Sequence, residues 1–273
     1  MKKYELTDET KIFCGKPLHR IVALRDFGNV RKGDIGGWIE KEDNLSQEGN
    51  CWVYGNAQVF DNARVFDNAK VFDNAQVYGN AKVFDNAKVL DNAKVLDNAR
   101  VYDNAWAFGS AKVFDNAQIF DKARVLDNAQ VYGKAQVFDK ARVYGGARVF
   151  GDAWAFDKAQ IYGNAKVLDK AQIFDKAQVY GKAQVYGNAK VYDNAQICSD
   201  AEIYNNKDYI VFKNWWSSGR YFTWTRSNNM CAVGCFYGTG EELIKKAYAD
   251  SEDKGKHYEE IVEYVNKCVL GNV

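Results

Sequence analysis

Residues 63–80 read ARVFDNAKVFDNAQVYGN, which is three copies of one six-residue pattern: Ala, Lys/Gln/Arg, Val/Ile, Phe/Tyr/Leu, Asp/Gly, Asn/Lys. Alanine keeps its place every six residues from Ala57 to Ala201, with no insertion or deletion. A fixed period of this kind decides a fold before any local propensity does. The hexad is therefore the first feature to explain.

A helix cannot use this pattern. At about 3.6 residues per turn, the Val and Ala positions would move around the cylinder and leave no single apolar face. In a strand, Ala and Val lie two residues apart and point to one side, while the Lys/Gln and the aromatic residue point to the other. The Asp-Asn or Gly-Asn pair then turns a corner, since Asn and Gly tolerate positive φ. Each hexad is thus expected to form one short side of a polygon.

One hexad cannot bury its apolar face alone, so successive coils are expected to stack through parallel strand ladders. Three hexads per coil give a triangular prism whose lumen is filled by Ala and Val. The predicted fold class is mainly β: an N-terminal cap at residues 1–50, a parallel β-helix of hexapeptide repeats at residues 51–206, and a small C-terminal α+β domain at residues 207–273.

The two ends leave the hexad pattern. A cap is expected over the first coil because the unpaired strand edges of an open solenoid end would otherwise polymerise. In the C-terminal part, residues 208–216, 221–226 and 230–236 are predicted to be three strands. A capping box at residues 239–242 and the helical spacing of apolar residues from Tyr258 to Val269 predict two helices after them.

Three segments near the N-terminus are more specific than the hexads: IVALRDF at 21–27, GGWI at 36–39 and NLSQEGNCWVY at 44–54. With the repeat, they resemble the YdcK-like β-solenoid family, which is similar in fold to the trimeric LpxA-like superfamily of hexapeptide transferases. The resemblance implies a left-handed β-helix and transfers no catalytic residues. It leaves a homodimer or homotrimer open. The C-terminal part resembles modules of phage-encoded and other bacterial proteins.

Overall composition argues against several partners. Basic and acidic residues nearly cancel, 37 against 36, so no net field attracts nucleic acid or an anionic membrane. The N-terminus lacks the apolar stretch of a signal peptide, and no apolar run is long enough to cross a bilayer, so a cytoplasmic location is expected. The six cysteines show no framework spacing, which predicts free thiols, and Cys231 and Cys235 are expected to be buried.

The repeat itself contains aromatic residues that could bind a partner. A step of eighteen residues aligns one unbroken aromatic column: Phe66, Phe84, Tyr102, Phe120, Phe138, Phe156, Phe174 and Tyr192. Stacking between coils is the favoured interpretation, and an exposed rail that binds a partner is the alternative. Trp106 and Trp154 replace the usual Lys/Gln. Lys88 and Arg124 would flank Trp106 and could give cation–π contacts.

A second candidate surface lies in the C-terminal part, where Trp215, Trp216, Arg220, Tyr221 and Trp224 fall within ten residues. Aromatic residues and arginine are enriched in interaction hot spots, so this cluster is a candidate surface for a protein or small-molecule partner. The alternative is that these side chains form the core of a small domain and the seam where it docks on the last coil.

Hexapeptide acyltransferases use a histidine base and loops that extend from the prism. Here His19 lies in the cap, His257 lies in a predicted helix, and the repeat has no loop to close over acetyl-CoA. We therefore expect a non-catalytic scaffold that presents a C-terminal recognition module, without a cofactor or metal. Two alternatives remain open: an acyl- or nucleotidyl-transferase, active or degenerate, and a phage-type counter-defence protein that sequesters a small molecule or a host protein.

Overall fold

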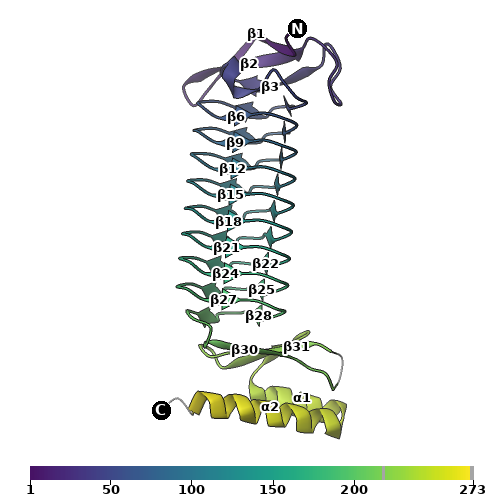
Figure 1. The fold of residues 1–273 in the computed structure, drawn as a ribbon, viewed down its shortest axis with the longest axis vertical. Coiled ribbons are helices and arrows are strands. Elements are labelled where there is room, and N and C mark those ends of the chain that lie inside the picture. The colour runs from purple at the N-terminus through teal and green to yellow at the C-terminus, as the bar shows by residue number, and fades with distance from the viewer. Residues whose placement is uncertain (217–218, 271–273) are drawn as a thin grey trace.

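The computed structural model describes residues 1–216 and 219–270. It shows a rod of stacked coils, with the N-terminal strands over one end and a small sheet with two helices at the other (Figure 1). The predicted mainly-β fold, a parallel solenoid followed by a small C-terminal domain with two helices, is confirmed. The left-handed sense of the coil stays a prediction.

Three parallel sheets form the faces of the prism, and each hexad contributes one two-residue strand. Face I contains β4 (Trp52–Val53), β7 (Lys70–Val71), β10 (Lys88–Val89), β13 (Trp106–Ala107), β16 (Arg124–Val125), β19 (Arg142–Val143), β22 (Gln160–Ile161), β25 (Gln178–Val179) and β28 (Gln196–Ile197). Face II contains β5 (Gln58–Val59), β8 (Gln76–Val77), β11 (Lys94–Val95), β14 (Lys112–Val113), β17 (Gln130–Val131), β20 (Arg148–Val149), β23 (Lys166–Val167), β26 (Gln184–Val185) and β29 (Glu202–Ile203). Face III contains β6 (Arg64–Val65), β9 (Lys82–Val83), β12 (Arg100–Val101), β15 (Gln118–Ile119), β18 (Gln136–Val137), β21 (Trp154–Ala155), β24 (Gln172–Ile173) and β27 (Lys190–Val191).

The lumen is filled as the hexad predicts. The Ala and Val/Ile positions of the repeat are fully buried, and the residues between them point outward. Neighbouring coils pair in register eighteen residues apart, as Lys88 does with Trp106. Apolar burial is worth about 25 cal/mol per Å², so many stacked coils together give the rod its stability.

The corners differ from the prediction in one respect. Positive φ falls on the Asp or Gly of each pair and not on the following Asn; for example, φ is 56° at Asp67 and 70° at Gly79. The next residue, such as Asn68, keeps its backbone N–H directed at the neighbouring coil and donates to the carbonyl oxygen of Asp85 at 2.9 Å. Many of these aspartates offset the strain of this conformation, because their carboxylates accept a backbone N–H of the next coil.

The N-terminal segment extends face II. β1 (Tyr4–Phe13) and β2 (Lys16–Ala23) pair antiparallel, β2 pairs antiparallel with β3 (Ile35–Ile39), and β3 pairs parallel with β5. A short 3₁₀ helix, η1 (Glu42–Asn44), follows. Above the first coil, Trp52 packs edge-to-face against Tyr4 and Phe27, with ring centroids 6.1 and 5.3 Å apart.

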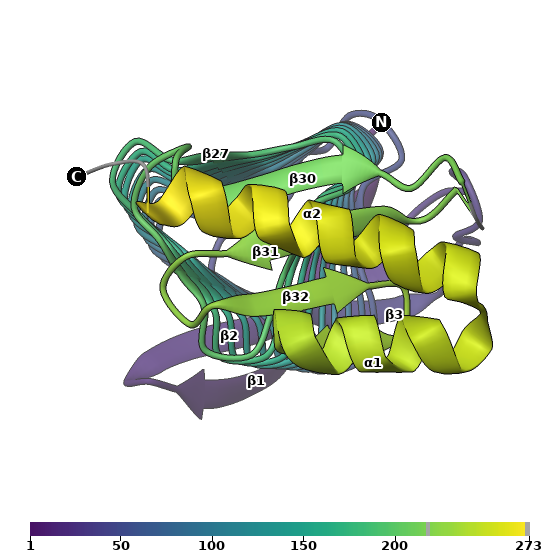
Figure 2. The same cartoon turned by 90° about the horizontal axis from the view of Figure 1, so that it is seen from below.

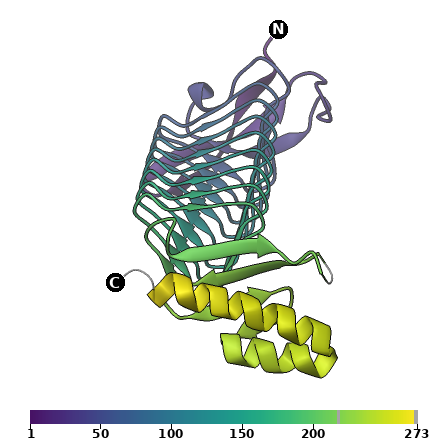
Figure 3. The ribbon, with the colours of Figure 1, turned by 60° about the horizontal axis from the view of Figure 1, so that its bottom comes forward.

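The C-terminal sheet contains β30 (Tyr209–Lys213), β31 (Tyr221–Thr225), β32 (Met230–Val233) and β33 (Phe236–Gly238) in antiparallel order. It lies between the last coil and the helices α1 (Gly240–Asp250) and α2 (Glu252–Leu270) (Figures 1 and 3). The predicted strand at 230–236 is wrong as one element, because a turn at Gly234 and Cys235 divides it into β32 and β33. The predicted capping box is confirmed: Thr239 and Glu242 bond reciprocally at the start of α1.

The C-terminal sheet has two different faces. Phe222, Trp224, Cys231 and Val233 point toward the helices and form the core of this domain. Tyr209 points the other way and joins the core of the solenoid. Figure 2 shows the helices crossing the end of the rod. In the described part of the chain, neither helix is long and apolar enough to cross a membrane.

Candidate functional site

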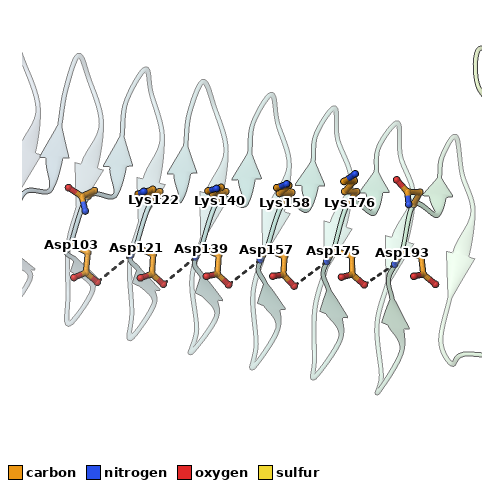
Figure 4. A pocket seen from close by; sticks show the side chains of 12 residues that line it. Asp103, Asp121, Lys122, Asp139, Lys140, Asp157, Lys158, Asp175, Lys176 and Asp193 are labelled. Carbon is orange, nitrogen blue, oxygen red and sulfur yellow. Dashed lines mark hydrogen bonds between the residues drawn. The ribbon is translucent and has the colours of Figure 1, made fainter.

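One corner of the prism, between faces III and I, has a composition that the other two corners lack. Within the hexads, each of its eight positions of positive φ is an aspartate, with φ between 54° and 58°: Asp67, Asp85, Asp103, Asp121, Asp139, Asp157, Asp175 and Asp193. We call it the Asp corner. From one coil to the next, Oδ2 of each aspartate accepts the backbone N–H of the aspartate eighteen residues later, at 3.1–3.4 Å. Figure 4 shows five steps of this ladder.

The aromatic column of the same corner is stacked. Consecutive rings lie 4.8–5.3 Å apart and nearly parallel, from Phe66 to Tyr192. These rings are half-buried, except Tyr192, which is 36% exposed. Offset ring stacking of this kind is favourable beyond the area it buries. The interpretation of the column as stacking between coils is therefore confirmed.

A row of lysines runs beside the aspartates. Lys122, Lys140, Lys158 and Lys176 follow the aspartates of four consecutive coils and, with them, line a groove of about 620 Å³ along the rod (Figure 4). Within residues 1–216 and 219–270, none of these four lysines makes an ion pair. Across these four coils the groove thus presents parallel rows of opposite charge.

The structure does not bring Trp106 and Trp154 together. Trp106 is on face I, half-buried, and its indole lies between Lys88 Nζ and the Arg124 guanidinium, 4.7 and 5.0 Å from the ring centroid. The predicted cation–π flanking is therefore confirmed. Trp154 is on face III, 40% exposed. Ala107 and Ala155 follow the two tryptophans at a position where the other hexads have Val or Ile, and nothing in the structure explains this substitution.

The C-terminal cluster separates into core and surface. Trp224 is core, 2% exposed, and its Nε1–H donates to Asn229 Oδ1 at 2.9 Å. Tyr221 is half-buried at the start of β31. Arg220 is exposed just before it. The five residues therefore do not form one patch.

Trp215 and Trp216 lie beside His257, which the sequence singles out only in the question of a catalytic base. Trp215 is 79% exposed, and the ring of His257 in α2 lies 6.0 Å from its ring and 5.0 Å from that of Trp216. Trp216 also packs edge-to-face on Tyr258, at 5.6 Å. The helical spacing that places Tyr258 in the core also indicates that His257 lies beside it, but no sequence signal pairs it with the tryptophans.

The prediction of two buried thiols at Cys231 and Cys235 is wrong for Cys235. Cys231 is buried in β32, whereas Cys235 is exposed in the turn that the predicted strand did not include. Cys14, Cys51, Cys198, Cys231 and Cys235 are free thiols, and Cys14 is also exposed. No group of three or more His, Cys, Asp or Glu side chains in the described residues could hold a metal ion.

Stacked hexads on three parallel sheets define this chain as a β-solenoid protein. A family model described as the YdcK β-solenoid repeat matches residues 57–72 and 183–199, so the chain is similar to that family in these two stretches. A stretch of 61 residues is 41% identical to the protein named "Uncharacterized acetyltransferase YdcK" of Escherichia coli (strain K12), over 19% of this chain and 19% of that protein. The match therefore spans about a fifth of the relative's length.

This match corrects one expectation. Sequence analysis predicted a protein that is not an enzyme, and that prediction is contradicted because the similar protein carries the name of an acetyltransferase. The prediction rested on the positions of His19 and His257 and on the lack of loops in the repeat. Those observations argue only against a site built from a histidine base and loops that extend from the prism. They do not address acetyl transfer by other residues.

Proposed function

We propose that this protein is a rigid β-solenoid scaffold that holds a C-terminal recognition module, residues 207–273, in a fixed position at the end of the rod. The observation that carries this proposal is the junction between them. On each face, the backbone N–H that would bond a further coil instead donates to a side-chain oxygen: Lys190 to Asn206 at 2.8 Å, Gln196 to Thr223 at 2.9 Å and Glu202 to Ser227 at 2.7 Å. The bonds to Thr223 and Ser227 join the module to faces I and II, and the hydroxyl of Tyr209 donates to the carbonyl oxygen of Lys190 on face III at 2.9 Å. Contacts on all three faces therefore restrict rotation of the module on the rod.

The rod itself is suited to this role. The Asp ladder and the stacked rings connect every coil of one corner to the next, in addition to the backbone ladders. The recognition surface that we assign to the module is built around Trp215, with Trp216 and His257 beside it. The exposed indole of Trp215 offers a partner a large apolar contact, and the half-buried Trp216 beside it helps to hold that indole in place.

Photo-cross-linking in the producing cell tests this proposal. A photoreactive residue at position 215 is expected to capture a partner, while one at position 12, on the N-terminal cap, serves as the control because Ile12 is 73% exposed there. Capture from position 215 and not from position 12 supports the proposal. Equal capture from both positions, or none from position 215, contradicts it.

Acetyl transfer is a second candidate, and its support is the name of the similar Escherichia coli protein. The test is an acetyl-transfer assay with acetyl-CoA and mixed amine and hydroxyl acceptors, run beside native mass spectrometry of the freshly purified protein. Bound acetyl-CoA together with turnover would establish an enzyme. If turnover occurs, loss in His257→Ala but not in His19→Ala would place the base in the module, and the reverse result would place it in the cap.

A further inference from the structure

The C-terminal module contains a pocket on its outer side, away from the last coil. It lies between the β32–β33 hairpin and the helices α1 and α2, and holds about 290 Å³. Phe236, Leu243 and Tyr258 supply apolar and aromatic walls, and Arg220, Lys246 and Lys254 line the same pocket. Small-molecule sites usually combine an apolar wall with a few placed charges, as this pocket does.

The charges around the pocket do not cancel. Lys254 Nζ lies 3.5 Å from Asp250 Oδ2, and these two residues form an ion pair. In the part of the chain that the structure describes, neither Arg220 nor Lys246 has an ion-pair partner. Two positive charges are therefore left uncompensated at the mouth of one cavity. A ligand with two negative charges would balance them.

The two unpaired cations are placed by different contacts. Arg220 runs across the hairpin turn at Gly234, where φ is +61° and an added Cβ would lie 2.8 Å from Arg220 Cδ. Gly234 thus leaves the space that Arg220 occupies. Lys246 Nζ lies over the ring of Phe236, 5.5 Å from its centroid. An anion that draws Lys246 away would uncover this ring, and a flat group could then stack on it.

We propose that this pocket binds a phosphate monoester carried on a flat ring, a ligand of mononucleotide size. A phosphate monoester carries a charge of about −1.5 to −2 at neutral pH, which matches the two uncompensated cations. The guanidinium of Arg220 can hold two phosphate oxygens at once, and Lys246 supplies a point charge beside it. Phe236 supplies the face for the ring. The inference rests on the proposed recognition role of the module and gives that role a ligand class.

Calorimetric titration of the full chain with adenosine 5′-monophosphate tests the proposal, with inorganic phosphate and adenosine as partial ligands. We expect saturable binding of the monophosphate that is tighter than binding of either partial ligand. Arg220→Gln and Lys246→Gln are each expected to weaken it at least about tenfold, because each removes a hydrogen bond to a charged group. Lys245→Gln is the matched control, since Lys245 is exposed on the same helix and does not line the pocket.

Three results would overturn the proposal: no saturable binding, equal affinity for the monophosphate and inorganic phosphate, or equal weakening by Lys245→Gln. All three variants change exposed residues, so circular dichroism is expected to show an unchanged fold. The cross-linking experiment at position 215 reports separately on a macromolecular partner. A failed titration with positive cross-linking therefore refutes the ligand class and leaves the recognition role standing.

Discussion

The backbone N–H of Gln196 in the last coil donates a 2.9 Å hydrogen bond to the side-chain oxygen of Thr223 in the C-terminal sheet. One coil earlier, the equivalent N–H, that of Gln178, donates to the carbonyl oxygen of Ala195 at 2.8 Å. The hydroxyl of Thr223 thus takes the place of the carbonyl oxygen that a further coil would supply. The backbone N–H at the edge of face I therefore has a hydrogen-bond acceptor although no further strand pairs with it.

Thr223→Val is expected to destabilise the protein. The change keeps the shape of a side chain that is 1% exposed and leaves the N–H of Gln196 buried without an acceptor. The free energy of unfolding should fall by about 1–3 kcal/mol, measured by chemical denaturation. Thr10→Val, on the exposed side of the cap, is the matched control and should leave the free energy unchanged.

Removing all three side-chain acceptors should expose a solenoid end that can pair with another molecule. The variant that combines Asn206→Ala, Thr223→Val and Ser227→Ala is expected to form larger assemblies than the parent chain, because free strand edges promote association. Light scattering during size-exclusion chromatography measures the mass. An unchanged mass would show that the C-terminal sheet blocks the end by coverage alone.

The Asp ladder gives a prediction about backbone conformation. Asp139 has φ of 55°, and its Oδ2 accepts the N–H of Asp157 at 3.3 Å. Asp139→Ala loses this bond and retains a side chain that disfavours the conformation, whereas Asp139→Gly loses only the bond. We expect the alanine variant to be less stable than the glycine variant by about 1 kcal/mol in chemical denaturation. Asp152→Ala, at an exposed position without positive φ, is the control.

Trp106 and Trp154 form a natural matched pair. Trp106 lies between two cations, whereas Trp154 pairs in its sheet with Gln136 and Gln172. Trp106→Gln should therefore cost more stability than Trp154→Gln, by about 1 kcal/mol for two partly exposed cation–π contacts. The two denaturation midpoints can be compared directly. Equal losses would assign no net energy to the flanking cations.

The six thiols should differ in reactivity. Cys14 and Cys235 are exposed and should react first with a thiol reagent on the folded protein. Cys231 should resist modification, because it is buried and burial raises the pKa of its thiol to about 12. Mass spectrometry after brief labelling identifies the modified sites. Slow labelling at Cys235 would contradict the turn that divides residues 230–236, and early labelling at Cys231 would contradict its burial in β32.

The stacked tyrosines predict a loss of stability in alkali. Burial raises the pKa of Tyr162 to about 12 from its ordinary value of 10.0. The folded chain therefore keeps a proton that the unfolded chain releases, so the stabilisation is complete below pH 10 and is lost as the pH rises toward 12. Circular dichroism and phenolate absorbance across this range measure the transition. Tyr162→Phe should make it less steep, while a parallel curve would contradict the assignment.

Some features could be predicted from single residues and others could not. The flanking of Trp106 by Lys88 and Arg124 followed from a step of eighteen residues, since register in a repeat places every outward side chain. The exposure of Cys235 did not follow, because a turn of two residues at Gly234 competes with a continuous strand and both satisfy the local pattern. The sequence marks Arg220 as a candidate through the aromatic residues beside it, but in the structure Arg220 lies against Gly234 and lines a pocket with Lys246 and Tyr258.

The sequence by itself determined the stacked coils, the filled lumen and the aromatic column. The reason is that a period of six with Ala and Val two residues apart buries both only when coils stack in register. Tertiary structure alone decided which corner residue takes positive φ, because the residue after it must direct its backbone N–H at a carbonyl oxygen of the next coil. It also decided that Thr223 accepts a hydrogen bond from Gln196 and that Arg220 and Lys246 line one pocket. The C-terminal strands and helices do not share the repeat of the solenoid, so their local sequence does not predict which residues come into contact.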